Sequence, residues 1–277
     1  MIDVAPTKQA APIIKYVGGK TKLLPELVKR APKKFGRYYE PFCGGAALFF
    51  HLAPGRAVLS DTNVDLIQLY ATISNDVEGV IRQLRRLARD HDEGHYYATR
   101  DRWNKAKMSG TARGATFIYL NKTCFNGLWR VNAAGEFNVP MGRYENPTIC
   151  NPDALRAAAT ALASTEVCLV DYREAVADAE RGDFVYCDPP YAPASATSNF
   201  TSYTAGGFSA DNQRELAELA RTLVDRGVHV MLSNSDTPFT RKLYRGFTIS
   251  RVTCGRSINS NAEKRGAVNE LIITGRV

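Results

Sequence analysis

Hydrophobic residues follow two different spacings along this chain, and the two spacings alternate. Short runs rich in β-branched and aromatic residues, each ending at a turn or helix signal, predict strands. A helical spacing follows Gly44 and extends through Leu52, and another covers Asp211–Asp225. This alternation is typical of an open parallel sheet covered by helices, so we expect an α/β fold. The predicted parallel strands are Arg37–Phe42, Arg56–Ser60, Glu166–Val170, Asp183–Cys187 and Gly227–Ser233.

The pattern changes near the end of the chain. Gly246–Thr253 and Val268–Thr274 both have a strand-like composition, and no helical pattern separates them. Two consecutive strands without an intervening helix can pair directly with each other. We therefore expect an antiparallel pair at one edge of the sheet.

Residues 63–165 interrupt the alternation of strands and helices. They open with amphipathic helical patterns over Asp65–Arg89 and Tyr96–Met108. The following stretch, Phe117–Pro147, is rich in Asn, Gly and aromatic residues, and Ala133-Ala134-Gly135 separates two strand-like runs within it, which predicts a β-hairpin. We predict that residues 63–165 form an inserted, mainly helical domain, and that residues 1–62 and 166–277 together form one α/β domain.

The composition is that of a globular protein, with 44% hydrophobic and 23% charged residues. Lys and Arg number 36 against 28 Asp and Glu, and the resulting net charge of +8 suits a polyanionic partner. No hydrophobic run approaches the roughly 18 residues that span a bilayer, and the N-terminus lacks the pattern of a signal peptide. We therefore expect a cytoplasmic protein with no membrane partner.

The cysteines and histidines do not indicate a metal site. The six cysteines form no CxxC pair, and neither they nor the four histidines have the spacing of zinc ligands. We therefore expect reduced thiols and no bound metal ion.

The tetrapeptide Asp188-Pro189-Pro190-Tyr191 directly follows a predicted strand. An exocyclic amine on a base is a poor nucleophile, because its lone pair is delocalised into the ring. The Asp188 carboxylate and the Pro189 carbonyl could accept hydrogen bonds from its two N–H groups and so localise the lone pair. The two prolines have no N–H donor and restrict the backbone, and the Tyr191 ring offers a face on which a base can stack. The tetrapeptide therefore indicates methylation of a base amine.

Two further strands are predicted to end at an aspartate, Asp61 and Asp171. Ligands of open α/β sheets bind at the carboxyl ends of strands, which would place Asp61 beside a ribose diol. Each aspartate could instead be the N-cap of the next helix. The glycines at Gly44 and Gly45 let the backbone approach a nucleotide-like ligand, and the turn within Lys15–Lys20 could cover it. The sequence has no GxGxxG motif and no P-loop, which disfavours dinucleotides and nucleoside triphosphates.

These motifs, in this order, resemble those of the Dam-type DNA adenine methyltransferases. The similarity extends from about Lys15 to Thr274 and includes NGLWRVN…GEFNVPMGRY at Asn126–Tyr144, CDPPYAPASATSNFTSY at Cys187–Tyr203 and RSINSN at Arg256–Asn261. The resemblance implies methyl transfer from S-adenosyl-L-methionine to N6 of adenine in double-stranded DNA, within GATC, with the target base flipped out of the duplex. It also implies a Rossmann-like methyltransferase sheet with helices on both faces, and a DNA-recognition role for residues 63–165.

Carried over position by position, the resemblance implies three groups of site residues. The catalytic group is Asp188, Pro189, Pro190 and Tyr191, which would hold the flipped adenine. The cofactor group is Tyr16, Lys20, Glu40, Phe42, Gly44, Asp61, Asp171, Tyr172 and Asp188. The DNA-binding group is Phe125, Asn126, Leu128, Arg130, Asn138, Pro140, Arg143, Tyr144 and Asn199.

Within the DNA-binding group, Phe125 matches an aromatic residue that intercalates in the duplex, and the chemistry of Arg130 suits a bidentate contact with a guanine edge. Basic side chains elsewhere suit phosphate contacts. These are Lys122, Arg143, Arg256, Lys264 and Arg265.

Three positions depart from the family pattern. Tyr16 stands where many relatives have Trp, Ala46 where relatives often have a third glycine, and Phe125 where relatives have Tyr. The first and the last keep an aromatic ring. The loss of the hydroxyl at Phe125 could alter the affinity for the DNA site.

The polar stretch Ser195–Gly207 predicts a loop that becomes ordered over DNA when the adenine flips, with a plain connector as the alternative. Two other functions stay open. The same cofactor chemistry could act on N4 of cytosine, on an RNA base or on a protein amide. A catalytically silent DNA-binding protein is the second, and a failure to bind S-adenosylmethionine would support it. We expect a monomer, with a restriction endonuclease as a candidate genetic rather than physical partner.

Overall fold

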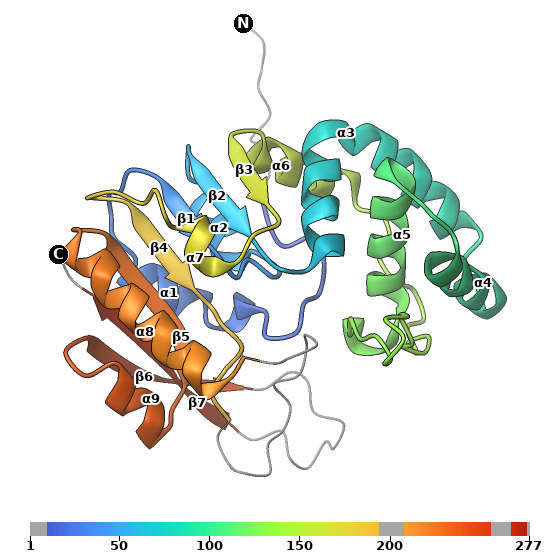
Figure 1. Cartoon of the computed structure of the whole chain (residues 1–277). Helices are drawn as coiled ribbons and strands as arrows, with labels where there is room; N and C mark the ends of the chain where they lie inside the picture. The colour runs from blue at the N-terminus through green and yellow to red at the C-terminus, as the bar shows by residue number, and fades with distance from the viewer. Residues whose placement is uncertain (1–9, 194–207, 256–266, 276–277) are drawn as a thin grey trace, which may run out of the picture. The chain divides into compact units, whose positions relative to one another are not determined.

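The computed structural model describes residues 10–193, 208–255 and 267–275 (Figure 1). The predicted loop over Ser195–Gly207 and the positions Asn199, Arg256, Lys264 and Arg265 lie outside these residues. The helices are α1 (Leu24–Arg30), α2 (Ala47–Leu52), α3 (Val64–Arg89), α4 (Glu93–Lys105), α5 (Gly110–Thr123), α6 (Pro152–Leu162), α7 (Tyr172–Ala175), α8 (Ala210–Asp225) and α9 (Pro238–Leu243), with short 3₁₀ turns η1 (Lys20–Lys22) and η2 (Phe125–Gly127). The strands are β1 (Tyr38–Glu40), β2 (Ala57–Ser60), β3 (Thr165–Cys168), β4 (Phe184–Cys187), β5 (His229–Ser235), β6 (Thr248–Gly255) and β7 (Ala267–Gly275).

Seven strands form one mixed sheet in the order β3-β2-β1-β4-β5-β7-β6. Strands β2, β1, β4 and β5 run parallel, with Tyr38 opposite Ala57 and Phe184 opposite His229. Strand β7 is antiparallel to both β5 and β6. The α/β class is therefore confirmed, and so is the antiparallel pair near the end of the chain.

The parallel strands form the core of the sheet. Every residue of β1, β2 and β4 is buried. Strands buried on both faces need nearly continuous hydrophobic sequence, which is what β2 (AVLS) and β4 (FVYC) carry. These runs made the strands visible in the sequence, with bounds that differ from the structure by a few residues.

By internal contacts the chain divides into two compact units. The first unit contains the described residues of Met1–Lys20, Gly44–Ala53 and Asn63–Leu169. The second contains those of Thr21–Cys43, Pro54–Thr62 and Val170–Val277.

In the second unit, α8 packs against β5 (Figure 1). The helix begins with a capping box, in which the Ser209 side chain accepts the backbone N–H of Asn212 and the Asn212 side chain accepts that of Ser209. Its buried residues recur at helical spacing and form one stripe toward the sheet. They are Gln213, Leu216, Ala217, Ala220 and Leu223.

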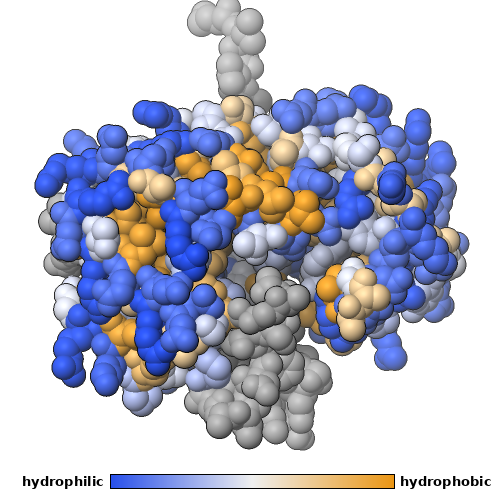
Figure 2. All heavy atoms as spheres, viewed as in Figure 1, coloured by the Kyte–Doolittle hydropathy of each residue, from blue (hydrophilic) through white to orange (hydrophobic). Residues whose placement is uncertain are grey.

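In the first unit, α3 packs against both α5 and α6. The predicted helix over Asp65–Arg89 is present but kinked, because Asp76 has non-helical angles (φ −149°, ψ 68°) and its side chain accepts the backbone N–H of Gly79. The outward-facing side chains of α3 and α4 are mostly hydrophilic, as Figure 2 shows. Among them are Arg82, Arg85, Arg86 and Arg89.

The segment that follows differs in part from its prediction. Residues Phe117–Thr123, assigned to the Asn- and Gly-rich stretch, are the second half of α5. The predicted hairpin then appears as two isolated antiparallel bridges, Cys124 with Met141 and Val131 with Phe137. It turns through Asn132 to Glu136, whose backbone groups are bonded at 2.9 Å. The hairpin is therefore short, and side chains of neighbouring helices hold much of its backbone.

Candidate active site

Three acidic residues stand at the carboxyl ends of three neighbouring parallel strands of the second unit. Glu40 is the last residue of β1, Asp61 comes directly after β2, and Asp188 directly after β4. These strands are adjacent in the order β2-β1-β4 and run in one direction, so their carboxyl ends meet at one edge. This edge is where ligands of open α/β sheets bind.

The Asp188 carboxylate acts on the groups around it. Burial first, and this carboxylate second, raise the pKa of the Tyr186 hydroxyl, the Cys187 thiol and the Tyr191 hydroxyl well above their usual values. All three therefore stay protonated and neutral near neutral pH. Asp188 Oδ1 is itself buried, and in such low-dielectric surroundings a carboxylate is a strong hydrogen-bond acceptor.

The Tyr191 side chain is tied to the antiparallel part of the sheet. Its hydroxyl donates to Oε2 of Glu270 on β7 at 2.8 Å. The ring is thereby fixed at its far end, and Asp188 and Tyr191 are held on opposite ends of one rigid tetrapeptide. Glu270 was not identified from the sequence, because a single Glu within a predicted edge strand carries no distinguishing pattern.

Phe42 and Tyr172, which were predicted to bind the cofactor, lie together in the second unit. Their rings stack with centroids 5.2 Å apart, and Phe208 meets both rings edge-on or tilted within 6.0 Å. Nearby in sequence, Glu40 is 3% exposed and accepts a 2.8 Å hydrogen bond from the Tyr38 hydroxyl. Aromatic faces suit an adenine ring, and carboxylates suit ribose hydroxyls and an ammonium group, so these residues fit S-adenosylmethionine.

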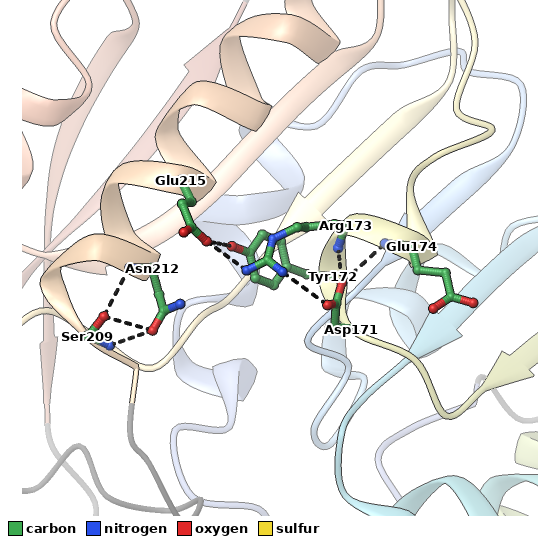
Figure 3. Close-up of polar contacts among 7 residues, drawn as sticks. All are labelled: Asp171, Tyr172, Arg173, Glu174, Ser209, Asn212 and Glu215. Carbon is green, nitrogen blue, oxygen red and sulfur yellow. Dashed lines mark hydrogen bonds and ion pairs between the residues drawn. The ribbon is translucent and has the colours of Figure 1, made fainter.

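Asp171 differs from the other strand-terminal aspartates. Strand β3 ends at Cys168, and Asp171 is the exposed N-cap of α7, where its carboxylate accepts the backbone N–H groups of Arg173 and Glu174 (Figure 3). Arg173 also pairs with Glu215 at 2.7 Å. The capping alternative therefore describes Asp171 in this structure, whereas Tyr172 beside it joins the aromatic cluster.

Three further residues that were predicted to bind the cofactor belong to the first unit: Tyr16, Lys20 and Gly44. A Cβ atom on Gly44 would come within 3.1 Å of the Tyr16 ring, and Gly44 has a positive φ of 45°, so glycine suits this close approach. The Tyr16 hydroxyl accepts a 3.3 Å hydrogen bond from Asn63. Lys20 is 9% exposed and donates from Nζ to the Gly18 carbonyl at 2.7 Å. The glycine turn therefore packs directly on the aromatic side chain.

The predicted DNA-binding side chains line the hairpin of the first unit. Arg130 donates from Nε to the Asn138 side chain at 2.9 Å, and the Phe125 N–H bonds the Pro140 carbonyl at 2.9 Å. The structure thus pairs these residues across the two arms. Leu128 and Tyr144 are partly buried, whereas the other described members of the group are exposed. These are Phe125, Asn126, Arg130, Asn138, Pro140 and Arg143.

The hairpin is anchored on α4 and α5. The Trp129 ring stacks between Phe117 and Phe137, with centroid distances of 3.9 and 4.5 Å. The Asn104 side chain bonds both backbone groups of Phe137, at 2.9 and 3.0 Å. These contacts hold the exposed face of the hairpin on a rigid base.

Lys15 and Asn121 join this site although the sequence did not assign them to it. Lys15 Nζ lies 3.2 Å from the Tyr144 hydroxyl and 4.5 Å from its ring centre. The fully buried Asn121 side chain bonds the backbone N–H and carbonyl of Lys15, at 2.8 and 2.7 Å, and the Gly127 carbonyl at 3.3 Å. Residues 106 positions apart are therefore tied together, a relationship that local sequence patterns do not reveal.

The described residues contain neither a metal-ligating cluster nor a membrane-spanning helix. Within residues 10–193, 208–255 and 267–275, no group of three or more His, Cys, Asp or Glu side chains could hold a metal ion. None of the helices in those ranges is both long enough and apolar enough to cross a membrane.

Comparison with known proteins identifies the family. Residues 16–258 match the family model of the D12 class N6 adenine-specific DNA methyltransferases. The Type II methyltransferase M1.LlaDCHI of Lactococcus lactis subsp. cremoris is 40% identical over 268 residues, which covers 95% of this chain and 94% of that relative. The DNA adenine methylase of Haemophilus influenzae is 37% identical over 273 residues, covering 98% and 95%, and that of Escherichia coli (strain K12) is 37% identical over 268 residues, covering 96% and 95%. The chain therefore belongs to the D12 class of N6 adenine-specific DNA methyltransferases.

Proposed function

We propose that this methyltransferase modifies adenine within GATC in double-stranded DNA, on a base flipped out of the duplex. The observation that carries the proposal is the exposed face of the hairpin. There Phe125, Arg130 and Pro140 are exposed on a segment that is packed against α5 through Trp129. Arg130 is held at Nε by Asn138, so the edge formed by its two terminal nitrogens points away from that bond. That edge suits the O6 and N7 acceptors of guanine in the major groove.

The proposal assigns the methyl donor and its binding residues. The D12 family uses S-adenosyl-L-methionine, which supplies the methyl group. In this chain, Phe42 and Tyr172 would contact the adenine ring and Asp61 the ribose. Glu40 would bind the methionine end, while Tyr16, Lys20 and Gly44 would cover the cofactor. Asp171 would contribute near the adenine ring through the helix it caps.

The proposal also assigns the chemistry of the tetrapeptide. The Asp188 carboxylate and the Pro189 carbonyl would accept hydrogen bonds from the two N–H groups of adenine N6, which localises the lone pair on that nitrogen. The Tyr191 ring would stack on the flipped base. Positioning and electrostatics then supply the acceleration.

The division of labour follows from these assignments. Residues 1–62 and 166–277 would form the catalytic domain, a Rossmann-like sheet with helices on both faces, and residues 63–165 the inserted recognition domain with its hairpin. The chain would act on DNA as a monomer. Because some relatives are Type II methyltransferases, a restriction endonuclease is the proposed genetic partner, without a physical complex.

Base-resolved mapping of methylation tests the proposal. The purified protein is incubated with unmethylated genomic DNA and labelled S-adenosylmethionine. We expect N6-methyladenine in GATC and nowhere else. Methylation of adenine in another sequence would refute the GATC assignment and the roles of Leu128, Arg130, Pro140 and Tyr144. Label on N4 of cytosine, on RNA or on protein would favour the other acceptors, and a protein that binds no cofactor would favour the silent scaffold.

A further inference from the structure

The backbone on both sides of Tyr191 is held by two buried amide side chains, one from α8 and one from β5. Gln213 is 1% exposed and donates from Nε2 to the Pro190 carbonyl at 2.8 Å. Asn234 is fully buried, and its Oδ1 accepts the Ala192 N–H at 3.1 Å. The two amides are joined, because Asn234 Nδ2 donates to Gln213 Oε1 at 2.9 Å. A chain of three hydrogen bonds therefore runs from the N–H of residue 192 to the carbonyl of residue 190.

The direction of this chain is fixed at its Asn234 end. Oδ1 of Asn234 also accepts the backbone N–H of Ser235 at 2.8 Å, so this atom must be the carbonyl oxygen. Nδ2 of Asn234 is then the donor to Gln213, which leaves Gln213 Nε2 as the donor to Pro190. Replacing the Gln213 nitrogen by a carboxylate oxygen would therefore remove the hydrogen bond to Pro190, and replacing the Asn234 nitrogen would remove the one to Gln213.

Gln213 stands where α8 would otherwise carry an apolar residue. It is the first member of the buried stripe that continues with Leu216 and Ala217. Burying an amide is unfavourable unless its polar groups are hydrogen-bonded. The bonds to Pro190 and Asn234, rather than packing alone, account for a glutamine at this position.

We infer that Gln213 and Asn234 are positioning residues for methyl transfer, acting through the Pro190 carbonyl and the Ala192 N–H on the tetrapeptide between them. The inference rests on the proposed function, in which the Pro189 carbonyl accepts the adenine amine. Both proline rings fix their φ angles, so holding the Pro190 carbonyl leaves the preceding peptide little freedom. Neither amide would touch the base. Each would act through the backbone on the Pro189 carbonyl and the Tyr191 ring, which would touch it.

Two isosteric substitutions, Gln213→Glu and Asn234→Asp, test this role. Each replaces the donating nitrogen by a carboxylate oxygen, which cannot donate when ionised. At about pH 8 we expect the single-turnover rate on a GATC duplex to fall roughly 100-fold, because small misplacements of reacting groups have effects of this size. The dissociation constant for S-adenosylmethionine should stay unchanged.

Acidification should restore the rate in both variants. Once protonated, the introduced carboxyl donates through its O–H and accepts through its carbonyl, which reproduces the amide it replaced. Burial raises the pKa of an introduced carboxyl, so restoration should occur within the working range of the enzyme. We expect the rate relative to wild type at the same pH to rise about tenfold per pH unit on acidification from about pH 8. A purely structural role would not produce this dependence.

Asn212→Asp is the matched control, since it makes the same change one residue earlier on α8. The Asn212 Oδ1 accepts from the backbone N–H and the hydroxyl of Ser209, both at 2.9 Å (Figure 3). A carboxylate keeps this acceptor. We expect the wild-type rate and a pH-independent ratio to wild type.

Four results would overturn the inference. A wild-type rate in Gln213→Glu at about pH 8 would do so, and so would a loss that acidification does not relieve. If the wild-type protein itself methylates no adenine, the proposed function fails and this inference fails with it. Should Gln213→Glu not fold, Gln213→Met keeps the approximate volume without a donor. A reduced rate with unchanged cofactor affinity in that variant supports the inference, and a wild-type rate overturns it.

Discussion

The Tyr191 hydroxyl and the Glu270 carboxylate are joined by a 2.8 Å hydrogen bond that connects the end of the tetrapeptide Asp188–Tyr191 to β7. Strand β7 is two positions from β4 in the sheet, so the bond crosses over β5. Burial, together with the nearby Asp188 and Glu270 carboxylates, raises the pKa of Tyr191 well above its usual value. The hydroxyl therefore stays protonated and remains a donor near neutral pH.

Tyr191→Phe removes this hydrogen bond and keeps the ring. We expect the free energy of unfolding to fall by about 1–2 kcal/mol, because the Glu270 carboxylate loses a donor in partly buried surroundings. Urea denaturation measures the change. Glu270→Gln, which retains a neutral acceptor, should have a smaller effect. Equal losses in the two variants would show that the bond is not the source of the stability.

Asp188→Ala should abolish methyl transfer while DNA binding survives. The variant removes the buried carboxylate that would localise the lone pair on adenine N6, and we expect a loss of at least 10²- to 10³-fold, roughly that of removing one preorganised polar group from an active site. Labelled methyl incorporation and a gel-shift assay measure the two properties. Asp178→Asn serves as a control, because Asp178 pairs with Arg37 on the surface. Retained methylation in Asp188→Ala would refute the assignment.

Arg130→Ala should reduce discrimination at one guanine of the site by about 1–3 kcal/mol, since the variant loses a bidentate base contact. Asn138→Ala should act in the same direction but more weakly, because it releases Arg130 Nε without removing the guanidinium. The measurement compares kcat/KM on GATC with that on a duplex changed at the guanine. Arg143→Ala should lower kcat/KM equally on both duplexes, as expected of a residue that contacts a phosphate. If Arg130→Ala lowered kcat/KM equally on both duplexes, Arg130 would also be assigned to a DNA phosphate contact and not to a base contact.

Protonation of His91 in acid should lower the stability of the first unit. Burial, then the neighbouring His95, lowers the pKa of His91, so the folded state binds this proton less readily than the unfolded state does. The resulting loss of stability begins as the pH falls through the ordinary histidine value of about 6.5 and is complete below the lowered pKa. His91→Gln, which can still form a hydrogen bond with the Tyr119 hydroxyl, should lose less stability on acidification. Thermal unfolding at several pH values measures this, and parallel pH profiles would contradict it.

The strands could be predicted from sequence because burial on both faces forces a nearly continuous hydrophobic run, as in Phe184–Cys187. Helix α5 was missed because the same burial hides a helical period. Its residues Gly114–Asn121 are buried on all sides, so no polar face marks a helical period. Helix α9 has only six residues, too few for any period to be visible.

The site residues also differ in how far their sequence pattern is local. Asp188 and Asp61 were assigned to the site because a strand end followed by an acidic residue is a local signal, and both directly follow strands in the structure. The same signal was assigned to Asp171, but the strand before it ends three residues earlier and its carboxylate caps α7, so its cofactor role stays a prediction. Glu270, Gln213 and Asn121 could not be found, because their partners lie 79, 23 and 106 positions away and only the folded chain brings them together.

The partners of the Asn121 side chain are three main-chain atoms, two on residue 15 and one on residue 127. The N–H and carbonyl that Asn121 binds on residue 15 are present in every amino acid except proline, so these two bonds do not depend on the side chain at that position. The fit is narrower at residue 127, because Gly127 has a positive φ of 65° and a Cβ atom there would come within 2.6 Å of the Lys15 side chain. A chimera that exchanges segments between relatives therefore needs to preserve both the asparagine and the glycine, whereas the side chain at residue 15 can vary.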